Sequence, residues 1–159
     1  MNSASPEPDV LWLRNRHPSR RVNTRLLRQI VRWLITEELA LTRFELGIQL
    51  VPDHQMIFLN ETFLHHAGST DVIAFNHAPT HQPDWVHGEV FVCLDEAERN
   101  GRRYRASWST EMVRYIIHGI LHLQGHDDQR PAKRRLMKRE ENRLLKRLGR
   151  QFCYARLEA

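Results

Sequence analysis

The sequence predicts an α+β fold in which helices cover a small mixed β-sheet. Short segments with alternating or β-branched apolar residues recur before residue 95. Apolar residues at helical spacing lie between them, and the last third of the chain has the pattern of consecutive helices. With 159 residues, 41% of them hydrophobic and 27% charged, the chain suits one domain with one core.

The expected strands cover residues 10–17, 44–51, 70–76 and 88–94. The segment FELGIQLV shows the clearest strand signal, because its apolar residues recur at every second position. Residues 76–87 contain two prolines and three histidines without periodicity, and they predict a loop. The elements therefore follow the order β-α-β-α-β-β-α-α-α.

The expected helices cover residues 24–40, 53–64, 95–104, 110–124 and 131–148. Each of them starts at a residue type that suits a helix start, namely Asn23, Pro52, Asp95, Ser107 or Ser109, and Pro131. Gly149 would follow the last helix. We expect residues 1–9 to be a disordered leader, residues 10–150 a single domain and residues 151–159 a C-terminal tail.

Composition limits the location of the protein and the kinds of metal site. Its longest apolar run is far shorter than the roughly 20 residues of a membrane helix, and its N-terminus lacks a signal-peptide pattern. We therefore expect a cytoplasmic protein that does not enter a membrane. Cys93 and Cys153 lie far apart without a CxxC pair, so any metal would be held by histidine and carboxylate.

Charge is segregated along the chain. The net charge is +3 for residues 1–50, −8 for residues 51–98, +10 for residues 99–150 and 0 for residues 151–159. By itself the basic run of the last third would be an ordinary solvated helix face. Beside an acidic, histidine-rich middle that attracts cations, it favours binding of a polyanion such as nucleic acid.

The segment HGILHLQGHDD, which begins at His118, predicts a metal site. His118 and His122 are four residues apart and would project from one face of a helix toward one ion. Gly125 can end that helix in the left-handed conformation, after which Asp128 would supply a third ligand, with His126 as the alternative. Three protein ligands with a position left for water are typical of catalytic zinc.

Two observations weigh on this hypothesis. A lone HxxxH pair is weak evidence, because most such pairs are solvated or satisfied in a core, but the glycine turn and the carboxylate strengthen it. Zinc proteases carry a glutamate directly after the first histidine, and here that position is Gly119. Peptidase chemistry is therefore disfavoured, and a reaction driven by metal-bound hydroxide is favoured.

The sequence resembles the YbeY family of metal-dependent rRNA-maturation endoribonucleases, whose signature is HGxLHLxGxDH. HGILHLQGHD at 118–127 follows this signature closely. LNETFL at 59–64 and STDVIAF at 69–75 resemble the family's "LN...PTDVLSF" segment, and GEVFVCLDEA at 88–97 resembles its "GDIxI" strand. The resemblance covers roughly residues 44–145 in consistent order, and the combination is more specific than any single motif.

The resemblance implies a zincin-like α+β fold, one zinc ion per chain and hydrolysis of single-stranded RNA. The chain would act on rRNA of the small ribosomal subunit, in maturation of the 16S rRNA 3′ end and in ribosome quality control. His118 and His122 would act through the metal-bound water, and His66 is a further candidate catalytic residue. The residues expected to hold the RNA backbone by charge are Arg102, Arg103, Arg105, Lys133, Arg134, Arg135 and Lys138.

The chain departs from the family pattern at two positions. The usual third histidine falls at Asp128, and carboxylate is an acceptable zinc ligand. The usual arginine after the asparagine falls at Leu64, which cannot clamp phosphate or stabilise a transition state. The neighbouring His65 or His66 would take part of that role. Lower or altered nuclease activity is therefore an open alternative.

Two other functions remain as alternatives. The first is a non-catalytic ribosome-assembly or RNA-binding factor whose metal is structural, which Leu64 favours. The second is a metal hydrolase of a small molecule or peptide, which Gly119 and the basic last third disfavour.

Overall fold

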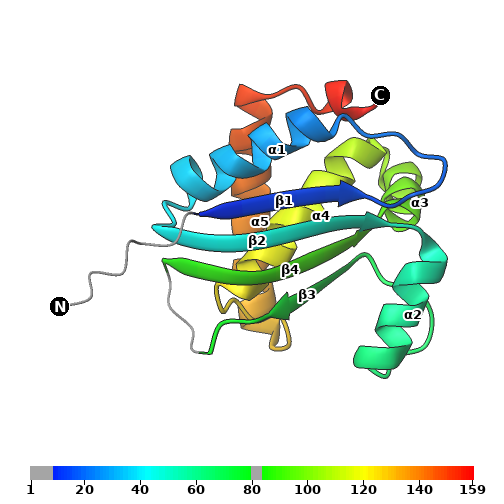
Figure 1. Cartoon of the computed structure of the whole chain (residues 1–159), viewed down its shortest axis with the longest axis horizontal. Coiled ribbons are helices and arrows are strands. Elements are labelled where there is room, and N and C mark those ends of the chain that lie inside the picture. Colours follow the sequence, from blue (N-terminus) through cyan, green and yellow to red (C-terminus); the bar gives the residue numbers. More distant parts are fainter. Residues whose placement is uncertain (1–8, 80–83) are drawn as a thin grey trace.

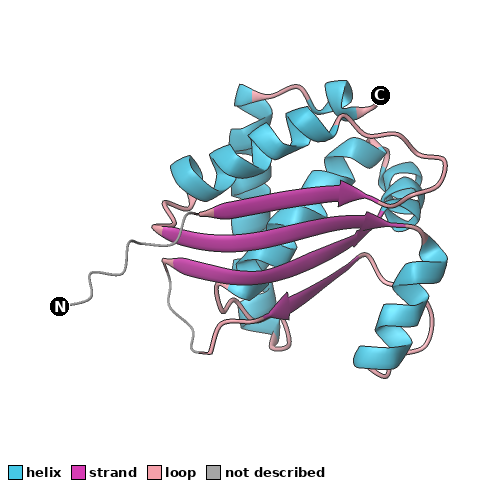
Figure 2. Cartoon of the chain, viewed as in Figure 1, coloured by secondary structure: helices cyan, strands magenta, loops and turns pink. Residues whose placement is uncertain are grey.

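The structure is a computed structural model that describes residues 9–79 and 84–159. Its strands are β1 (Val10–Asn15), β2 (Arg43–Val51), β3 (Val72–Asn76) and β4 (Trp85–Cys93). They form one mixed sheet in the order β1-β2-β4-β3 (Figure 2). β1, β2 and β4 are parallel, and β3 pairs with β4 in the antiparallel direction. The prediction of an α+β fold with a small mixed sheet is confirmed.

The α-helices are α1 (Thr24–Trp33), α2 (Asp53–Phe63), α3 (Leu94–Tyr104), α4 (Trp108–Leu123) and α5 (Pro131–Gln151). Their order along the chain is the predicted one (Figure 1). The side chain of Asn23 accepts a hydrogen bond from the backbone N–H of Leu26, and that of Ser107 accepts one from Thr110. Both residues are therefore N-caps, and Pro131 begins α5.

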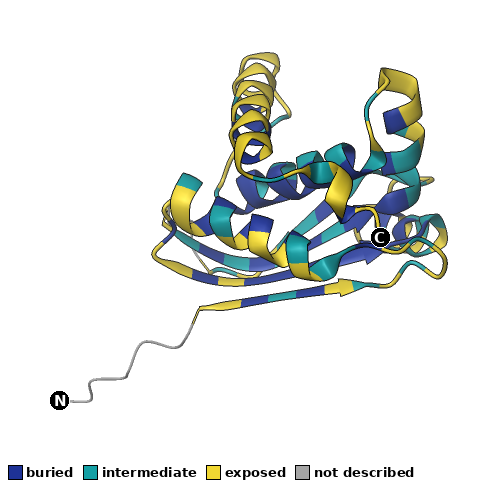
Figure 3. Ribbon diagram, turned by 90° about the horizontal axis from the view of Figure 1, so that it is seen from above, coloured by how far each residue is buried: buried dark blue, intermediate teal, exposed yellow. Residues whose placement is uncertain are grey.

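The main core lies between the sheet and the helices that cover one of its faces. Most of the 16 residues of α4 are buried, and α4 packs on β3 and β4. Alternation along β4 directs Val90 and Val92 into this core, whereas Phe91 and Cys93 belong to a smaller cluster on the other side. α2 covers that second cluster through Met56. In Figure 3 the buried residues gather where helices and strands meet.

The clearest differences from the predicted boundaries are in α5, α1 and β4. α5 continues to Gln151, so Gly149, expected to follow this helix, lies inside it. The expected helix 24–40 is α-helical only to Trp33, and a π-helix follows at Leu34–Glu38. The Thr36 hydroxyl donates to the Arg32 carbonyl at 2.8 Å, so a side chain competes for a helix carbonyl there. β4 begins inside the expected loop 76–87, because its first residues pair with β2 in register, a contact that local periodicity does not reveal.

Residues 151–159, expected to form a tail, pack on the domain instead. A 3₁₀ helix spans Tyr154–Leu157, and Leu157 is fully buried. The Asn23 N–H donates to the Leu157 carbonyl at 2.8 Å, and Glu158 forms a β-bridge with Val22. The C-terminal segment thus closes against the start of α1.

The expected leader, residues 1–9, lies outside the described residues except for Asp9. The Asp9 carboxylate accepts a hydrogen bond from the Phe44 N–H at 3.1 Å, at the start of the strand pairing. In the part of the chain that the structure describes, no helix has the length and apolar character needed to cross a membrane.

Candidate metal centre

α4 carries one polar row on an otherwise buried helix. Glu111, Arg114, His118 and His122 follow one another at spacings of three or four residues. Residues at these spacings lie on one face of a helix, so their side chains form a continuous row. The row ends at the C-terminus of α4, where the two histidines meet.

His118, His122 and Asp128 converge on one point. The Nε2 atoms of the two histidines lie 3.0 Å apart, and Asp128 Oδ2 lies 3.5 Å from His118 Nε2 and 3.4 Å from His122 Nε2. Donor atoms bound to one tetrahedral zinc ion at about 2.0–2.2 Å lie roughly 3.3 Å from each other. The three side chains, all half-buried, therefore match the donor set and spacing that zinc requires.

The turn after α4 brings Asp128 to the histidines. Gly125 has a φ of 97°, and its N–H donates to the His122 carbonyl at 2.9 Å, while the His126 N–H donates to the Leu121 carbonyl at 3.0 Å. This pair of bonds is a Schellman motif, which ends the helix and reverses the chain. The left-handed conformation explains why glycine suits position 125.

The structure does not bring the other two histidine candidates into the centre. His126 is exposed and is not part of the group of three. His66 is exposed after α2, and its backbone N–H donates to the Asn60 carbonyl. Neither His66 nor Leu64 lines the cavity beside His118.

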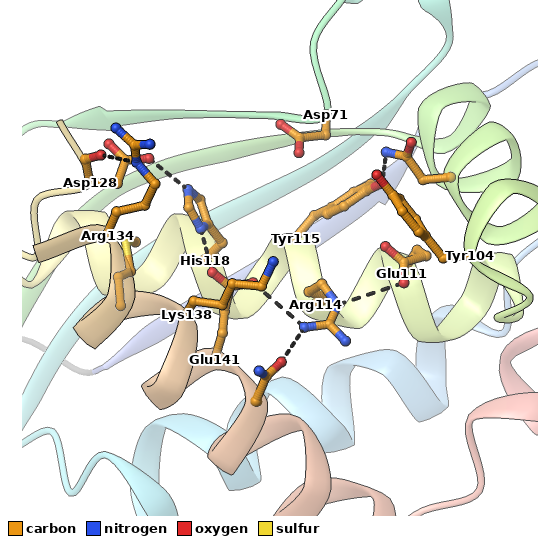
Figure 4. Close-up of a pocket in the computed structure, with 13 residues that line it drawn as sticks. Asp71, Tyr104, Glu111, Arg114, Tyr115, His118, Asp128, Arg134, Lys138 and Glu141 are labelled. Carbon is orange, nitrogen blue, oxygen red and sulfur yellow. Dashed lines mark hydrogen bonds and ion pairs between the residues drawn. The ribbon is translucent and has the colours of Figure 1, made fainter. Parts of the chain in front are cut away.

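A cavity of about 500 Å³ lies beside the centre, between α3, α4, α5 and the residue before β3 (Figure 4). Its lining includes Asp71, Asn100, Tyr104, Glu111, Arg114, Tyr115, His118, Asp128, Arg134, Met137, Lys138, Glu141 and Asn142. The expected RNA-binding residues are divided by this geometry. Arg134 and Lys138 line the cavity. The other expected RNA-binding residues are exposed and lie outside the cavity, namely Arg102, Arg103, Arg105, Lys133 and Arg135.

Several residues that line the cavity were not predicted from the sequence, although two sequence patterns could have indicated them. Arg114 and Glu111 continue the helical row of the histidines toward the N-terminus of α4. Glu141 is a polar residue at a buried position of α5, four residues after Met137 and three before Leu144. A charged residue in such a row usually has a partner, because burying an unpaired charge is costly.

Glu141 provides that partner to His118. Its Oε2 atom lies 2.7 Å from His118 Nδ1. Burial lowers the pKa of His118, but the hydrogen bond with Glu141 and the charges of Glu141, Asp71 and Asp128 raise it, and the net direction is upward. The surroundings of this imidazole thus favour positive charge, whether a proton or a metal ion carries it.

A second group of potential ligands, Asp53, Cys93 and Asp95, has different chemistry. Arg99 donates two hydrogen bonds to the Asp53 carboxylate, at 2.6 and 2.7 Å, which lowers the pKa of Asp53 to about 2. Burial raises the pKa of the Cys93 thiol to about 12. A protonated thiol and a carboxylate paired with arginine suit a structural link between α2, β4 and α3, not a metal site.

Comparison with known proteins identifies the family. Residues 13–149 match the family model described as "Endoribonuclease YbeY". The Endoribonuclease YbeY of Salinibacter ruber is 32% identical over 146 residues, which cover 87% of this chain and 91% of that protein. The Endoribonuclease YbeY of an Anaeromyxobacter species is 34% identical over 139 residues, which cover 86% and 68%.

Comparison of structures supports the same fold. The solution structure of TM1509 from Thermotoga maritima matches with a TM-score of 0.61 over 89% of each chain, at 23% sequence identity. Since the family model covers most of the sequence, the resemblance seen in HGILHLQGHD is confirmed, and the chain belongs to the YbeY family.

Proposed function

We propose that this chain is a metal-dependent endoribonuclease that cleaves single-stranded RNA during rRNA maturation. The single observation that carries the proposal is the convergence of His118, His122 and Asp128 beside a cavity to which α5 contributes the cations Arg134 and Lys138. Its relatives named Endoribonuclease YbeY support the reaction class. The substrate would be rRNA of the small ribosomal subunit, including the 16S rRNA 3′ end, in the cytoplasm.

His118, His122 and Asp128 would hold one zinc ion. When bound, such an ion acidifies a water molecule and so supplies a nucleophile near neutral pH. The reaction would be hydrolysis of a phosphodiester bond. Gly119 cannot act as a general base, so this centre differs from that of the HExxH proteases.

Arg134 and Lys138 would hold the RNA backbone next to the reacting phosphate. They lie four residues apart on α5 and line the cavity that contains His118 and Asp128 (Figure 4). Arg134 Nε also donates to the Asp128 carbonyl at 3.1 Å, which keeps its guanidinium near the centre. Contacts of this kind neutralise phosphate and carry little base specificity.

The role of the family's missing arginine would thus pass from α2 to α5. Leu64 ends α2, is 43% exposed and does not line the cavity. A cation that acts on phosphate has to lie in the cavity, where α5 supplies two. The exposed basic residues outside the cavity, Arg102, Arg103, Arg105, Lys133 and Arg135, would add weaker backbone contacts.

The test is a cleavage assay with purified protein on single-stranded RNA and on a duplex of the same sequence. We expect cleavage of the single strand with zinc present and none after chelation, and His118→Ala and His122→Ala should abolish it. A short peptide substrate should stay intact. His66→Ala should cleave like the wild type, because His66 lies outside the cavity.

The non-catalytic alternative gives a different result in the same assay. Leu64 is the observation that favours it, since it replaces a residue type suited to transition-state stabilisation. A protein that binds single-stranded RNA and zinc but leaves the RNA intact under all metal conditions would overturn the enzymatic proposal in favour of an assembly factor.

A further inference from the structure

A buried carboxylate on α5 contacts the proposed metal centre from behind its first histidine. Glu141 is only 9% exposed, and its Oε2 lies 2.7 Å from His118 Nδ1. Figure 4 shows Glu141 pointing from α5 toward His118, on the side of the ring away from Asp128. The two ring nitrogens of His118 therefore face different groups.

This contact decides which tautomer of His118 is present. A carboxylate can only accept, so Nδ1 has to carry the proton that it donates to Glu141. In the neutral ring Nε2 then keeps its lone pair, and this is the atom that faces His122 and Asp128. The same hydrogen bond limits rotation of the ring about its side-chain bonds.

The charge of Glu141 is balanced on its other oxygen. Glu141 Oε1 lies 3.8 Å from Arg114 Nη1, and Arg114 is itself held by a 2.6 Å hydrogen bond to Asn142. A carboxylate so deeply buried needs such a partner to stay ionised. The preceding residue, Glu140, instead accepts hydrogen bonds of 2.5 and 3.0 Å from Arg143.

We propose that Glu141 is a positioning residue of the metal centre. Through its hydrogen bond to Nδ1 it selects the His118 tautomer, holds the ring in the orientation that an ion needs and raises the basicity of Nε2. The inference rests on the proposed metal centre and adds a residue from a different helix to it. Groups that orient a metal-binding histidine typically change metal affinity by 10- to 100-fold.

The experiment compares zinc affinities of the full chain by competition with a chromophoric chelator. Glu141→Ala should weaken zinc binding about 10- to 100-fold. Glu141→Gln keeps an acceptor oxygen and should recover much of that loss. Glu140→Ala is the matched control, because it removes the same charge one residue away, and it should stay within about twofold of the wild type. Circular dichroism checks that every variant is folded.

A second readout reports the tautomer directly. Nitrogen-15 NMR of the zinc-free protein should show the Nδ1–H form of neutral His118 in the wild type and in Glu141→Gln. Glu141→Ala should show a mixture of the two tautomers. A residue that merely stabilised α5 would leave this ratio unchanged.

Three results would overturn the inference while leaving the metal centre intact. They are wild-type affinity in Glu141→Ala, an equal loss in Glu140→Ala, and a loss in Glu141→Gln as large as that in Glu141→Ala. If the wild type binds no zinc, the metal centre fails, and this inference fails with it. If the wild type binds zinc without cleaving RNA, only the proposed function fails.

Discussion

Asp128 is the residue on which the proposed centre most depends. It is the one carboxylate of the group, and its Oδ2 lies at almost equal distances, 3.5 and 3.4 Å, from the two histidine Nε2 atoms. His126 precedes it by two residues but is exposed and lies outside the group of three. Replacing Asp128 and replacing His126 should therefore have different effects on zinc binding.

Asp128→Ala should reduce zinc affinity by more than the roughly 10- to 100-fold that outer residues typically contribute, because it removes a ligand itself. His126→Ala should bind zinc like the wild type. Isothermal titration calorimetry of both variants measures the difference. Loss of zinc binding in His126→Ala with retention in Asp128→Ala would assign the third ligand to the other residue.

Asp53 shows how one carboxylate makes stability depend on pH. Its folded-state pKa is about 2, lowered from 3.8 mainly by the hydrogen bonds from Arg99. Since the shift is downward, the stabilisation is present above the unfolded-state pKa and is lost as pH falls through the folded-state value. The ion pair lies near the surface, so solvent screening reduces its contribution.

Asp53→Asn should lower the free energy of unfolding by about 1 kcal/mol near neutral pH, and by much less near pH 2. Urea denaturation at the two pH values measures this difference. In an Arg99→Gln background the effect of Asp53→Asn at neutral pH should shrink. An unchanged effect in that background would assign the stabilisation to something other than the ion pair.

At the scale of the element, packing explains why α4 has a glycine where zinc proteases have a glutamate. A Cβ atom on Gly119 would lie 2.5 Å from Val90 Cγ1 and 3.3 Å from Val72 Cγ2. Position 119 therefore faces the sheet, where α4 lies close to β3 and β4. A side chain there has no space, quite apart from the reaction that the centre carries out.

Gly119→Ala should destabilise the protein by about 1–3 kcal/mol, because the sheet has to move away from the helix. Gly149→Ala is the control. Gly149 lies inside α5, and an added Cβ would have an ordinary 3.4 Å contact with Tyr154. That variant should be neutral or gain roughly 0.5–1 kcal/mol from helix propensity. Thermal unfolding of both variants distinguishes the cost of packing from the gain in helix propensity. Equal changes in stability for the two variants would contradict the packing argument.

For the whole molecule, the C-terminal segment connects the end of the chain to the start of α1. Leu157 is fully buried in the main core, and its carbonyl accepts a hydrogen bond from Asn23 at the start of α1. The segment therefore belongs to the cooperative unit, although it is short and begins after α5 has ended.

Leu157→Ala should lower the free energy of unfolding by about 2–5 kcal/mol, as expected for a large cavity in a core. Leu136→Ala is the matched control, because Leu136 is 59% exposed on α5 and should change stability by less than about 0.5 kcal/mol. Chemical denaturation followed by tryptophan fluorescence compares them. A small effect at Leu157 would mean that the segment is only loosely attached.

Charge segregation also acts on the whole molecule. Residues 99–150 carry a net charge of +10, and three of their cations, Arg114, Arg134 and Lys138, line the cavity. Binding of RNA should therefore release counterions.

Single-stranded RNA should bind more weakly as salt rises, and Lys138→Ala should reduce the slope of log affinity against log salt by about 0.7. Lys146→Ala removes an exposed charge of α5 outside the cavity and should change the slope less. Fluorescence anisotropy across a salt series measures both slopes. Affinity independent of salt would contradict the phosphate-contact model.

Much of the fold could be predicted because its signals are local. Alternation in β2 and the caps Asn23 and Ser107 specify elements within a few residues of themselves. The start of β4 and the burial of Leu157 could not be predicted in this way, since they depend on partners far away in the chain.

The same division applies to the site. By itself the sequence determined that His118 and His122 share a helix face and that Gly125 ends this helix, because helix geometry and glycine's conformational freedom are local properties. Only the tertiary structure decided that Asp128, and not His126, reaches the two histidines, and that Glu141 and Arg114 lie behind them. The contact between Glu141 and His118 depends on how α5 packs against α4, which is a long-range contact that no local pattern encodes.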